Sequence, residues 1–585
     1  MSVIGSNALA GASGQGGGGY EIERSLRFND DDSAYLSQTP SSAGNRKTWT
    51  WSCWVKRGDL SATSQHIFGN YYNSANDGFN VRFSSDTLHI FDLTSGSFGV
   101  NLVTDRVFRD PSAWYHLVIA FDTTQSTSTD RLKLYVNGVQ ETSFSSATYP
   151  NQNTDYNINT TNLIAIGRGG SYAGQYFDGS LADIHFVDGQ GLAASDFGEY
   201  DDNNVWQPKE YSGSYGTNGF HLDFSDNSSA SALGTDSSGN SNDWTVNNLQ
   251  SVTGNFGNYV NAITEPSGGW WSTGGSTLFF DGSTTTSNQA YTANSFDWDV
   301  SSFGFTGTIE YYISGSNSTI QHDGTTVHTS STAGWSSAIS INNVSTVTFS
   351  RSGAGPNVHA VRLNGSILVD TSFISAIDSS RDSPTNGDTA NDTGAGGEVS
   401  GNYCTFNPLD RSSSITLANG NLDASVSGVS WISLRGTIGV SSGKWYWETK
   451  INTSLSSSNT FMAGIGTAQQ SLTNYMINSA GAGYYSYDGN KYPTAGSYGA
   501  TYTNGDVIGI ALDMDAGTLT FYKNGVSQGQ SHSGLTGTWF PCSAFYGTLS
   551  ISTNFGQRPF AYAAPSGYKA LCTANLPDPT IADPS

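Results

Sequence analysis

Carboxylates are the first residues to examine for hydrolytic chemistry, because a glycosidase needs two of them about 5 to 9.5 Å apart across the scissile bond. On a β-strand such a pair usually appears as an E-x-D-x-x-E pattern. The glutamates here are scattered and form no such pattern, among them Glu141, Glu199, Glu310, Glu398 and Glu448. There is also no G-x-S-x-G, P-loop or H-E-x-x-H sequence, and His116, within an alternating strand, is expected to be structural. We therefore predict no catalytic residues and no enzyme activity.

One short segment has the ligand spacing of a cation site. Asp236, Ser238, Asn240 and Asn242 alternate oxygen-bearing side chains in the order D-x-S-x-N-x-N, which is similar to the first positions of a calcium loop. However, the glycine falls at the fourth place and no glutamate closes the loop. The segment is therefore either a calcium site or a turn rich in Asn, Asp and Gly.

Aromatic side chains in loops are candidates for ligand contact, because rings offer flat apolar faces while amides and carboxylates bind hydroxyl groups. For Tyr485 and Tyr487 the alternative to ligand contact is packing in the core. For the adjacent Trp270 and Trp271 the alternative is that they cover a junction between domains. The candidate ligand-binding residues are Tyr71, Tyr72, Asn73, Trp270, Trp271, Tyr487, Asp488, Asn490 and Tyr492.

Composition limits both the fold and the partners. A chain of 585 residues exceeds one hydrophobic core and predicts roughly three or four domains. Only 12% of the residues are charged, Gly is abundant, and no long stretch repeats apolar residues at helical spacing. The formal net charge of −24 repels phosphate backbones. We predict an all-β chain that binds no nucleic acid, and no apolar run is long enough to span a membrane.

Short alternating runs bounded by turn residues carry the β signal. In the run from Arg131 to Val139, alternation places Leu132, Leu134 and Val136 on one face, directly before an Asn137-Gly138 pair. Asn-Gly is the preferred sequence of a tight hairpin turn. A second Asn-Gly pair, at 364–365, predicts another hairpin.

The N-terminal segment and the cysteines bear on the cellular compartment expected for the chain. Residues 1–20 are rich in Gly, Ser and Ala, lack the features of a secretory signal, and are interpreted as an anchor to a larger particle. The four cysteines are scattered and match no zinc spacing, so reduced, buried thiols are expected. They are Cys53, Cys404, Cys542 and Cys572.

Residues 21–250 resemble the laminin-G or concanavalin A-like lectin family. The resemblance rests on SLRFNDDDSAYLS, WTWSCWVKR, WYHLVIAFD, LYVNGV, IAIGR and FDGSLADIHFVDG, in that order, followed by an extension to residue 250. It implies a curved antiparallel sandwich. It also suggests a structural calcium ion near Asn29, Asp30, Asp31, Asp32 and Asp183. No other cofactor is expected.

Residues 402–565 resemble the SPRY family. The ordered motifs are Leu434-Arg435-Gly436, SSGKWYWETKI, FMAGIG, GYYSYDGNKY, NGDVIGIALDMDAGTLTFYKNGV, WFPCSAFYG and ISTNFGQRPF. Between the two regions, 255–380 predicts a small inserted β-sandwich and 381–401 a polar linker, while 566–585 is a tail. The predicted fold is thus a chain of antiparallel β-sandwiches.

Together these features are similar to bacteriophage virion proteins. The first hypothesis is a tail fibre or adhesin, assembled in the bacterial cytoplasm and released by lysis, which docks to other virion proteins through residues 1–20. Its sandwich loops would bind a host-surface glycan or protein, and a homo-oligomer, for example a trimer, would raise avidity. The alternative is a capsid decoration or head-fibre protein, and a glycan depolymerase is the third hypothesis.

Overall fold

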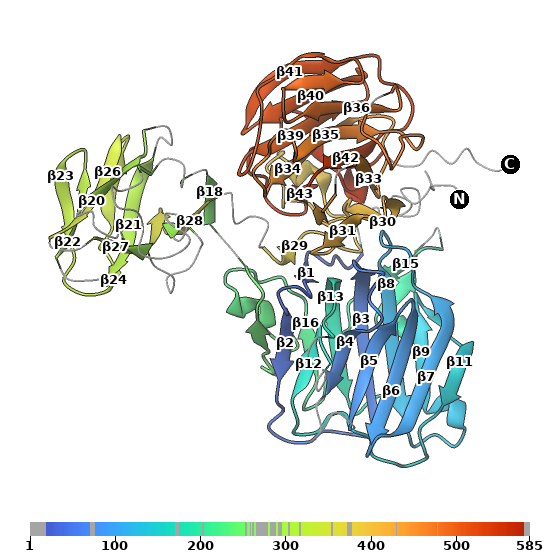
Figure 1. The fold of residues 1–585 in the computed structure, drawn as a ribbon. Helices are drawn as coiled ribbons and strands as arrows, with labels where there is room; N and C mark the ends of the chain where they lie inside the picture. Colours follow the sequence, from blue (N-terminus) through green and yellow to red (C-terminus); the bar gives the residue numbers. More distant parts are fainter. Residues whose placement is uncertain are drawn as a thin grey trace. The chain divides into compact units, whose positions relative to one another are not determined.

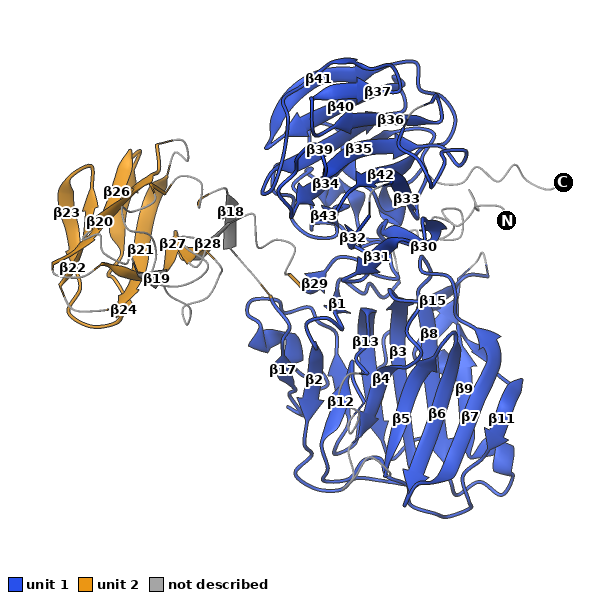
Figure 2. Ribbon diagram, in the orientation of Figure 1, with its two compact units in different colours: residues 1–250, 378–585 blue, residues 251–377 orange. Residues whose placement is uncertain are grey.

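The computed structural model divides the chain into two compact units, residues 1–250 with 378–585 and residues 251–377 (Figure 2). It describes residues 19–577 apart from 71–76, 170–174, 202–203, 252–253, 258, 260–262, 265–278, 281–287, 290–294, 302–304, 315–316, 353–354, 371–376, 429 and 477. The first unit contains two sandwiches, here called the N-terminal and the C-terminal sandwich, and the fold is all-β as predicted (Figure 1). The described helices are short 3-10 turns: η1 (Ser128–Asp130), η2 (Ala194–Asp196), η3 (Ser231–Gly234), η7 (Thr389–Asn391) and η8 (Thr573–Asn575).

The N-terminal sandwich consists of two eight-stranded sheets and a short hairpin. The first sheet has the order β10 (Val139–Gln140), β9 (Leu132–Val136), β8 (Tyr115–Asp122), β3 (Thr48–Arg57), β13 (Gly179–Asp188), β1 (Ser25–Phe28) and β29 (Ser379–Ser380), with β16 (Phe220–Leu222) also paired to β13. The second has the order β11 (Phe144–Thr148), β7 (Ser97–Val107), β6 (Thr87–Thr94), β5 (Gly78–Ser84), β4 (Gln65–Asn70), β12 (Ile164–Ile166), β2 (Tyr35–Gln38) and β17 (Thr245–Asn247). The hairpin joins β14 (Gly198–Tyr200) and β15 (Trp206–Pro208).

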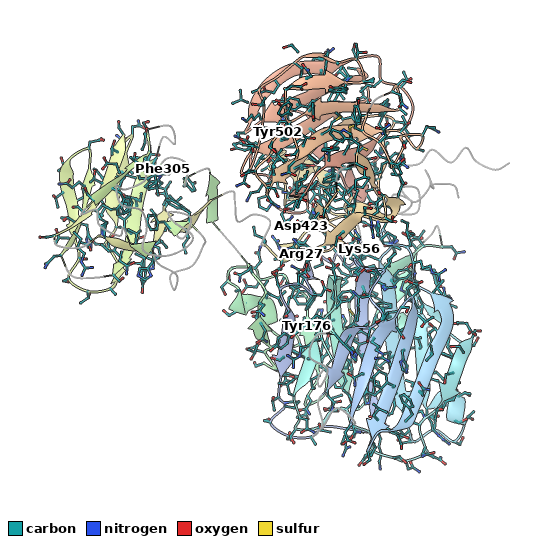
Figure 3. All side chains as sticks on the ribbon, in the orientation of Figure 1. Arg27, Lys56, Tyr176, Phe305, Asp423 and Tyr502 are labelled. Atoms are coloured by element: carbon teal, nitrogen blue, oxygen red, sulfur yellow. The ribbon has the colours of Figure 1, made fainter. Side chains whose placement is uncertain are left out.

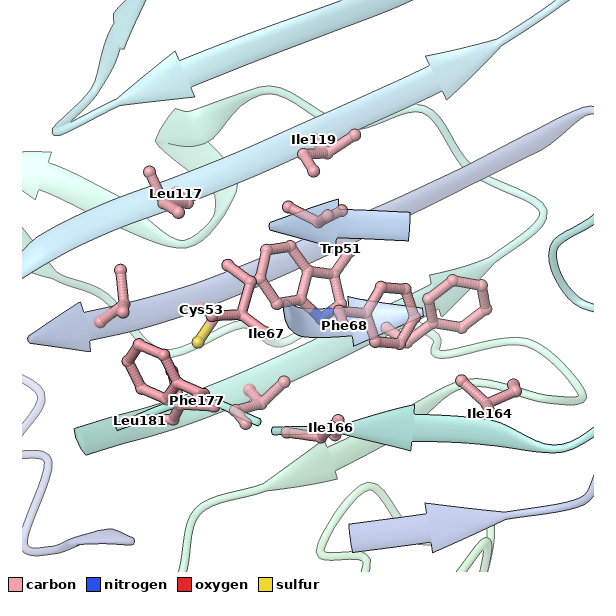
Figure 4. Packing of buried hydrophobic residues seen from close by; sticks show 14 of the residues in the cluster. Trp51, Cys53, Ile67, Phe68, Leu117, Ile119, Ile164, Ile166, Phe177 and Leu181 are labelled. Atoms are coloured by element: carbon pink, nitrogen blue, oxygen red, sulfur yellow. The ribbon is translucent and has the colours of Figure 1, made fainter. Parts of the chain in front are cut away.

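A layer of apolar side chains fills the space between these two sheets (Figure 4). Trp51 of β3 stacks on Phe68 of β4 with ring centroids 5.3 Å apart, so the two sheets meet directly through aromatic rings. The predicted face of β9 is confirmed, because Leu132, Leu134 and Val136 are buried in this core.

Unit 2 has a seven-stranded and a four-stranded sheet of its own. The first contains β18 (Gly254–Gly257), β28 (Ser366–Asp370), β27 (Asn357–Leu363), β21 (Thr306–Ser314), β24 (Gly334–Trp335), β19 (Asn288–Gln289) and β25 (Ile339–Asn342). The second has the order β20 (Ser295–Asp299), β26 (Thr346–Arg351), β22 (Ser318–His322) and β23 (Thr325–Thr329). A separate core that includes Trp298, Phe305 and Tyr311 lies within this unit.

The C-terminal sandwich packs a seven-stranded sheet on an eight-stranded one. The first has the order β30 (Phe406–Arg411), β33 (Ile432–Gly436), β42 (Phe540–Tyr546), β35 (Thr460–Gly466), β36 (Gly481–Tyr485), β37 (Asn490–Tyr492) and β38 (Gly496–Ser497). The second contains β31 (Ile415–Ala418), β32 (Asp423–Val426), β43 (Leu549–Asn554), β34 (Lys444–Ile451), β39 (Val507–Asp513), β40 (Thr518–Lys523), β41 (Val526–His532) and β44 (Lys569–Ala570).

The segment predicted to be a linker, 381–401, makes ordered contacts inside unit 1. Lys56 is labelled in Figure 3. Its Nζ donates hydrogen bonds to Asp382 at 2.9 and 3.1 Å, to Asn402 Oδ1 at 2.8 Å and to the Tyr403 carbonyl at 3.0 Å. Ser383 also donates to the carbonyl of Ile22. These contacts join the N-terminal sandwich to the chain that leads into the C-terminal one.

Candidate functional site

The outer face of the seven-stranded C-terminal sheet carries a group of aromatic side chains, here called the aromatic patch. Strand alternation explains it: Phe461 and Phe545 point into the core, whereas Met462 of β35 and Ala544 of β42 point outward. Aromatic rings lie over this outward layer. The aromatic patch consists of Trp431, Tyr475, Tyr485, Tyr487, Tyr492 and Tyr546.

The rings of the patch contact one another continuously. Trp431 lies at the centre, with its ring centroid 4.9 Å from Tyr475, 5.7 Å from Tyr485 and 5.7 Å from Tyr546. Tyr492 joins the group at 5.6 Å from Tyr475 and 5.8 Å from Tyr485. A buried floor of Met462, Met476, Cys542 and Ala544 supports these rings. The patch is therefore a fixed surface, because its rings are held by packing from below.

One carboxylate borders the aromatic patch. Burial, and then the nearby Asp488, raise the pKa of Tyr492, and the pKa of Tyr485 is raised mainly by burial. Asp488 accepts hydrogen bonds from the backbone N–H of Asn490 at 2.9 Å and from its side-chain amide at 2.7 Å. Tyr485 and Tyr492 therefore stay neutral near pH 7 and offer apolar faces together with hydroxyl groups.

Four predicted ligand residues lie at or beside this patch. Tyr487 is 53% exposed, which excludes core packing for that residue, whereas Tyr485 is partly buried. Asp488, Asn490 and Tyr492 follow in the same turn and strand. Sequence reasoning missed Trp431, Tyr475 and Tyr546, which come from other parts of the chain. The remaining candidates, Tyr71, Tyr72, Asn73, Trp270 and Trp271, lie outside the described residues.

The D-x-S-x-N-x-N segment forms a hydrogen-bonded turn. The Asp236 carboxylate accepts from the N–H groups of His221, Ser238 and Asn242 at 2.8 to 2.9 Å, and from the Ser238 hydroxyl at 2.9 Å. Asn240 and Asn242 both donate their amides to the Gly219 carbonyl. The turn is held by its own polar groups, and calcium binding there stays a prediction.

In the described part of the chain, Asp183 does not lie in one metal-binding group with the predicted calcium ligands Asp30 to Asp32. Asn29 donates to Asp32 at 2.7 Å, and Asp31 donates its backbone N–H to Asn29 at 3.3 Å, so this turn also bonds to itself. Burial, and then Asp31, raise the pKa of Asp30. Within the described ranges, the one group of three acidic, histidine or cysteine side chains close enough to share a metal ion is Asp183, His185 and His221, which contains none of Asp30, Asp31 and Asp32.

Asp183 is therefore surrounded by nitrogen donors that the sequence did not single out. Burial favours its neutral form, but His185 and His221 lower the pKa of Asp183 far below its usual range. Burial, and then His221, lower the pKa of His185. Burial also lowers the pKa of His221, but the hydrogen bond to Asp183 and the negative charges of Asp183, Asp223 and Asp236 together raise it above its usual value. The available signal was a histidine between two apolar residues in each of two strands, Ile184-His185-Phe186 and Phe220-His221-Leu222.

The hydrogen bonds of His116 hold its ring in a tautomer that cannot activate a serine nucleophile. The indole N–H of Trp206 donates to His116 Nδ1 at 2.9 Å, so the proton of the neutral ring lies on Nε2. That nitrogen is 2.8 Å from the Ser52 hydroxyl, to which it donates. Burial lowers the pKa of His116 to about 3. The ring in this state cannot accept the serine proton, as a nucleophilic serine would require.

Two families match the chain over the two sandwiches of unit 1. The concanavalin A-like lectin/glucanases superfamily matches residues 29–194, and the SPRY domain matches residues 444–558. The chain therefore carries a concanavalin A-like domain and a SPRY domain, which confirms both resemblances and their β-sandwich folds.

Three curated relatives match over 171, 171 and 148 residues. A Ran-binding proteins 9/10 homolog from Drosophila melanogaster is 31% identical over 27% of this chain and 18% of its own length. Ran-binding protein 9 from Xenopus tropicalis is 29% identical over 27% of this chain and 31% of its own length. The E3 ubiquitin-protein ligase RKP from Arabidopsis thaliana is 30% identical over 22% of this chain and 10% of its own length. The chain thus spans less than a third of each relative.

Solved SPRY domains also match. The SPRY domain of human HERC1 is 23% identical, covering 25% of this chain and 96% of that domain with a TM-score of 0.24. The TRIM65 PSpry domain is 15% identical, covering 26% of this chain and 89% of that domain with a TM-score of 0.22.

These relatives overturn the predicted biological role. The prediction of a phage tail fibre or adhesin is wrong, because the matching curated proteins are Ran-binding proteins and an E3 ubiquitin ligase of animals and a plant. Its decoration and depolymerase alternatives are withdrawn with it. The error came from reading a Gly-rich N-terminal segment beside two lectin-like sandwiches as a virion architecture. The predicted location and trimer are tested by none of these matches. No helix in the described part of the chain is long and apolar enough to cross a membrane.

Proposed function

We propose that the chain is a protein-binding module that recognises a segment of another protein through the aromatic patch of its SPRY domain. The observation that carries the proposal is the set of aromatic contacts around Trp431, with Tyr487 exposed at the edge of the patch. Large rigid rings on a packed floor are the side chains that dominate protein-binding hot spots, because they bury much area and lose little conformational entropy.

The names of these relatives support binding to proteins as the class of function. Two are named for binding Ran, and a third is named an E3 ubiquitin-protein ligase. Each match covers a minor part of the relative, so the proposal adopts the general class of protein interaction and names neither partner for this chain.

The patch favours a segment with apolar side chains and hydrogen-bond donors. Asp488 borders it with a negative charge, and the chain as a whole carries a formal charge of −24. A neutral or basic segment therefore meets no like-charge repulsion, whereas an acidic one does. The tyrosine hydroxyls can pair with the backbone of the bound segment.

The proposed function is binding without catalysis. The neutral tautomer of His116, with its proton on Nε2, supports this part of the proposal. Glu448 supports it as well, because its carboxylate already accepts from the N–H groups of Ala561 and Tyr562 at 2.6 and 2.9 Å and from the Tyr446 hydroxyl at 3.0 Å. A carboxylate held in this way stabilises the turn after β43.

A yeast-displayed library of random peptides tests the proposal. The full-length chain is used to select binders, which are then measured against Tyr487→Ala and Tyr485→Ala. We expect the selected peptides to lose roughly tenfold or more in affinity with these variants, about 1.4 kcal/mol. Tyr200→Ala is the matched control, since Tyr200 is 48% exposed on the N-terminal sandwich and its removal should leave affinity unchanged. Equal binding by all variants would contradict the proposal.

A further inference from the structure

Asp183, His185 and His221 meet on one face of the first sheet of the N-terminal sandwich. Asp183 and His185 belong to β13, where the pairing with β3 shifts register between Ala182 and His185 and Asp183 has a φ of 49°. His221 belongs to β16 and pairs directly opposite His185. The flanking Ile184 and Phe220 point into the core, so the three polar side chains lie together on the other face.

The donor atoms of the three side chains converge. Asp183 Oδ1 lies 2.7 Å from His221 Nε2, and Asp183 Oδ2 lies 3.1 Å from His185 Nε2. One ligand atom from each residue lies within 4.8 Å of the others. The Tyr20 hydroxyl is a further oxygen, 3.0 Å from Asp183 Oδ1. Asp183 and His185 are each 1% exposed, so water competes little for this group.

The opposite nitrogen of each imidazole has its own partner. His185 Nδ1 lies 2.8 Å from the Tyr215 hydroxyl, and His221 Nδ1 lies 3.0 Å from the Ser237 hydroxyl. Each hydroxyl can accept the Nδ1 proton. A bound cation could then take the Nε2 lone pair of each ring, in place of the proton that His221 Nε2 donates to Asp183 when no ion is bound. Histidines that bind metals are held in the same manner, with the second ring nitrogen donating to an oxygen.

A second observation points to a missing ligand. His185 Nε2 is fully buried and lies 3.1 Å from Asp183 Oδ2, but this contact lacks the geometry of a hydrogen bond. A buried polar atom without a hydrogen bond is costly, about 1–3 kcal/mol. A cation between the nitrogen and the carboxylate would satisfy both groups, and a lone pair facing an anion would otherwise be repelled.

We propose that Asp183, His185 and His221 form a binding site for a divalent transition-metal ion, with zinc as the best match. Two imidazole nitrogens and one carboxylate oxygen are typical ligands of such ions, whereas calcium prefers an all-oxygen shell. The two rings are stacked, with centroids 4.0 Å apart, so they must tilt for their Nε2 lone pairs to converge on one ion. The ion would fasten β16 to β13 and thus hold the chain around His221 on the first sheet of the N-terminal sandwich.

The test measures Zn²⁺ binding by the full-length chain after treatment with EDTA. Calorimetric titration with Zn²⁺ is expected to show one saturable site, and excess Zn²⁺ is expected to raise the Tm, because a ligand of the folded state stabilises it. A parallel titration with Ca²⁺ is expected to show no binding and no Tm shift that depend on His185 and His221. Calcium binding that His185→Gln and His221→Gln remove, in place of zinc binding, would overturn the assignment of the metal class.

Variants locate the site. His185→Gln and His221→Gln are expected to abolish both the saturable binding and the Tm shift. His89→Gln is the matched control, because His89 is a buried histidine of the same sandwich that lies outside the group, and it is expected to bind Zn²⁺ as the natural chain does. Unchanged Zn²⁺ binding by both His185→Gln and His221→Gln would overturn the proposal.

Co²⁺ gives a readout that does not depend on the variants folding. The natural chain with Co²⁺ is expected to show visible absorption bands of an ion bound to nitrogen and oxygen ligands, displaced by added Zn²⁺. Absence of both these bands and a saturable Zn²⁺ isotherm would show that a proton alone bridges Asp183 and His221, and the metal site would be rejected.

Discussion

The backbone N–H of Asp378 donates a hydrogen bond to the Gln250 carbonyl at 2.8 Å, and the N–H of Gln250 donates to the Asp378 carboxylate at 2.7 Å. These residues are the points at which the chain leaves and re-enters unit 1. Asp378 is also paired with Arg27 of β1 at 2.8 Å. The two ends of the insertion are therefore held together by unit 1 itself.

Removal of residues 251–377 should leave unit 1 folded. When a short Gly-Ser connection replaces them, we expect thermal unfolding followed by circular dichroism to give a Tm close to that of the full chain. A control deletion of 245–377 also removes β17, which pairs with β2, and is expected to lower the Tm clearly. A product of the first deletion that aggregates, or that lacks the near-ultraviolet signal of packed tryptophans, would contradict this prediction.

The ion pair between Lys56 and Asp382 should be important for the stability of unit 1. Their side chains are only 4% and 8% exposed, so Lys56→Met leaves a carboxylate buried without its partner. We expect the free energy of unfolding in urea to fall by about 3–5 kcal/mol.

Two variants check the origin of that loss. Lys47→Met removes a lysine that is 41% exposed, 3.8 Å from Asp155, and should cost about 1 kcal/mol or less. The double variant Lys56→Met with Asp382→Asn should recover part of the stability, because no unpaired charge is left. Equal losses of unfolding free energy from Lys56→Met and Lys47→Met would show that the buried pair stabilises the fold no more than an exposed pair does.

Asp178 should make unit 1 less stable as pH rises. Burial, and then Asp30, raise the pKa of Asp178 to about 8, while its oxygens accept the Gly420 N–H at 3.2 and 3.3 Å. Between the usual aspartate value of 3.8 and about pH 8, the folded chain holds a proton that the unfolded chain has released. Stability from this group is thus full below pH 3.8 and is lost as pH rises through about 8.

Asp178→Asn should remove this dependence, because the amide oxygen can still accept the Gly420 N–H. We expect the slope of unfolding free energy against pH to become more positive than in the natural chain, by up to about 1.4 kcal/mol per pH unit. Urea unfolding at a series of pH values in that window measures the slopes. Asp226→Asn, at an exposed aspartate, serves as control; the same slope in Asp178→Asn as in the natural chain would mean that Asp178 is ionised when folded.

Local patterns predicted the strands and turns correctly. Asn137 and Gly138 have φ values of 48° and 79°, and Asn364 and Gly365 have 50° and 85°, as the two predicted hairpin turns require. These features are readable from sequence because turn geometry and strand alternation depend on neighbouring residues. The ordered motifs of the SPRY domain were likewise sufficient for its fold.

The candidate sites were only partly predictable. The aromatic patch was found at Tyr487 and Tyr492, but its centre, Trp431, lies more than fifty residues earlier in the chain. Asp183 was selected together with Asp30, Asp31 and Asp32, and its place beside His185 and His221 was not predicted, because nothing local in the sequence links Asp183 to His221. Buried polar residues within apolar strands were the one signal that could have prompted a search for partners.

By itself, the sequence determined the β class, the two sandwiches that match known families, the hairpin turns and the absence of a catalytic motif. Only the tertiary structure decided that segment 381–401 joins the two sandwiches, that His221 pairs opposite His185, and that rings from four parts of the C-terminal sandwich form one patch. The physical reason is that strand register and sheet packing bring together residues far apart in sequence, and their pairing energies depend on partners that no local window contains.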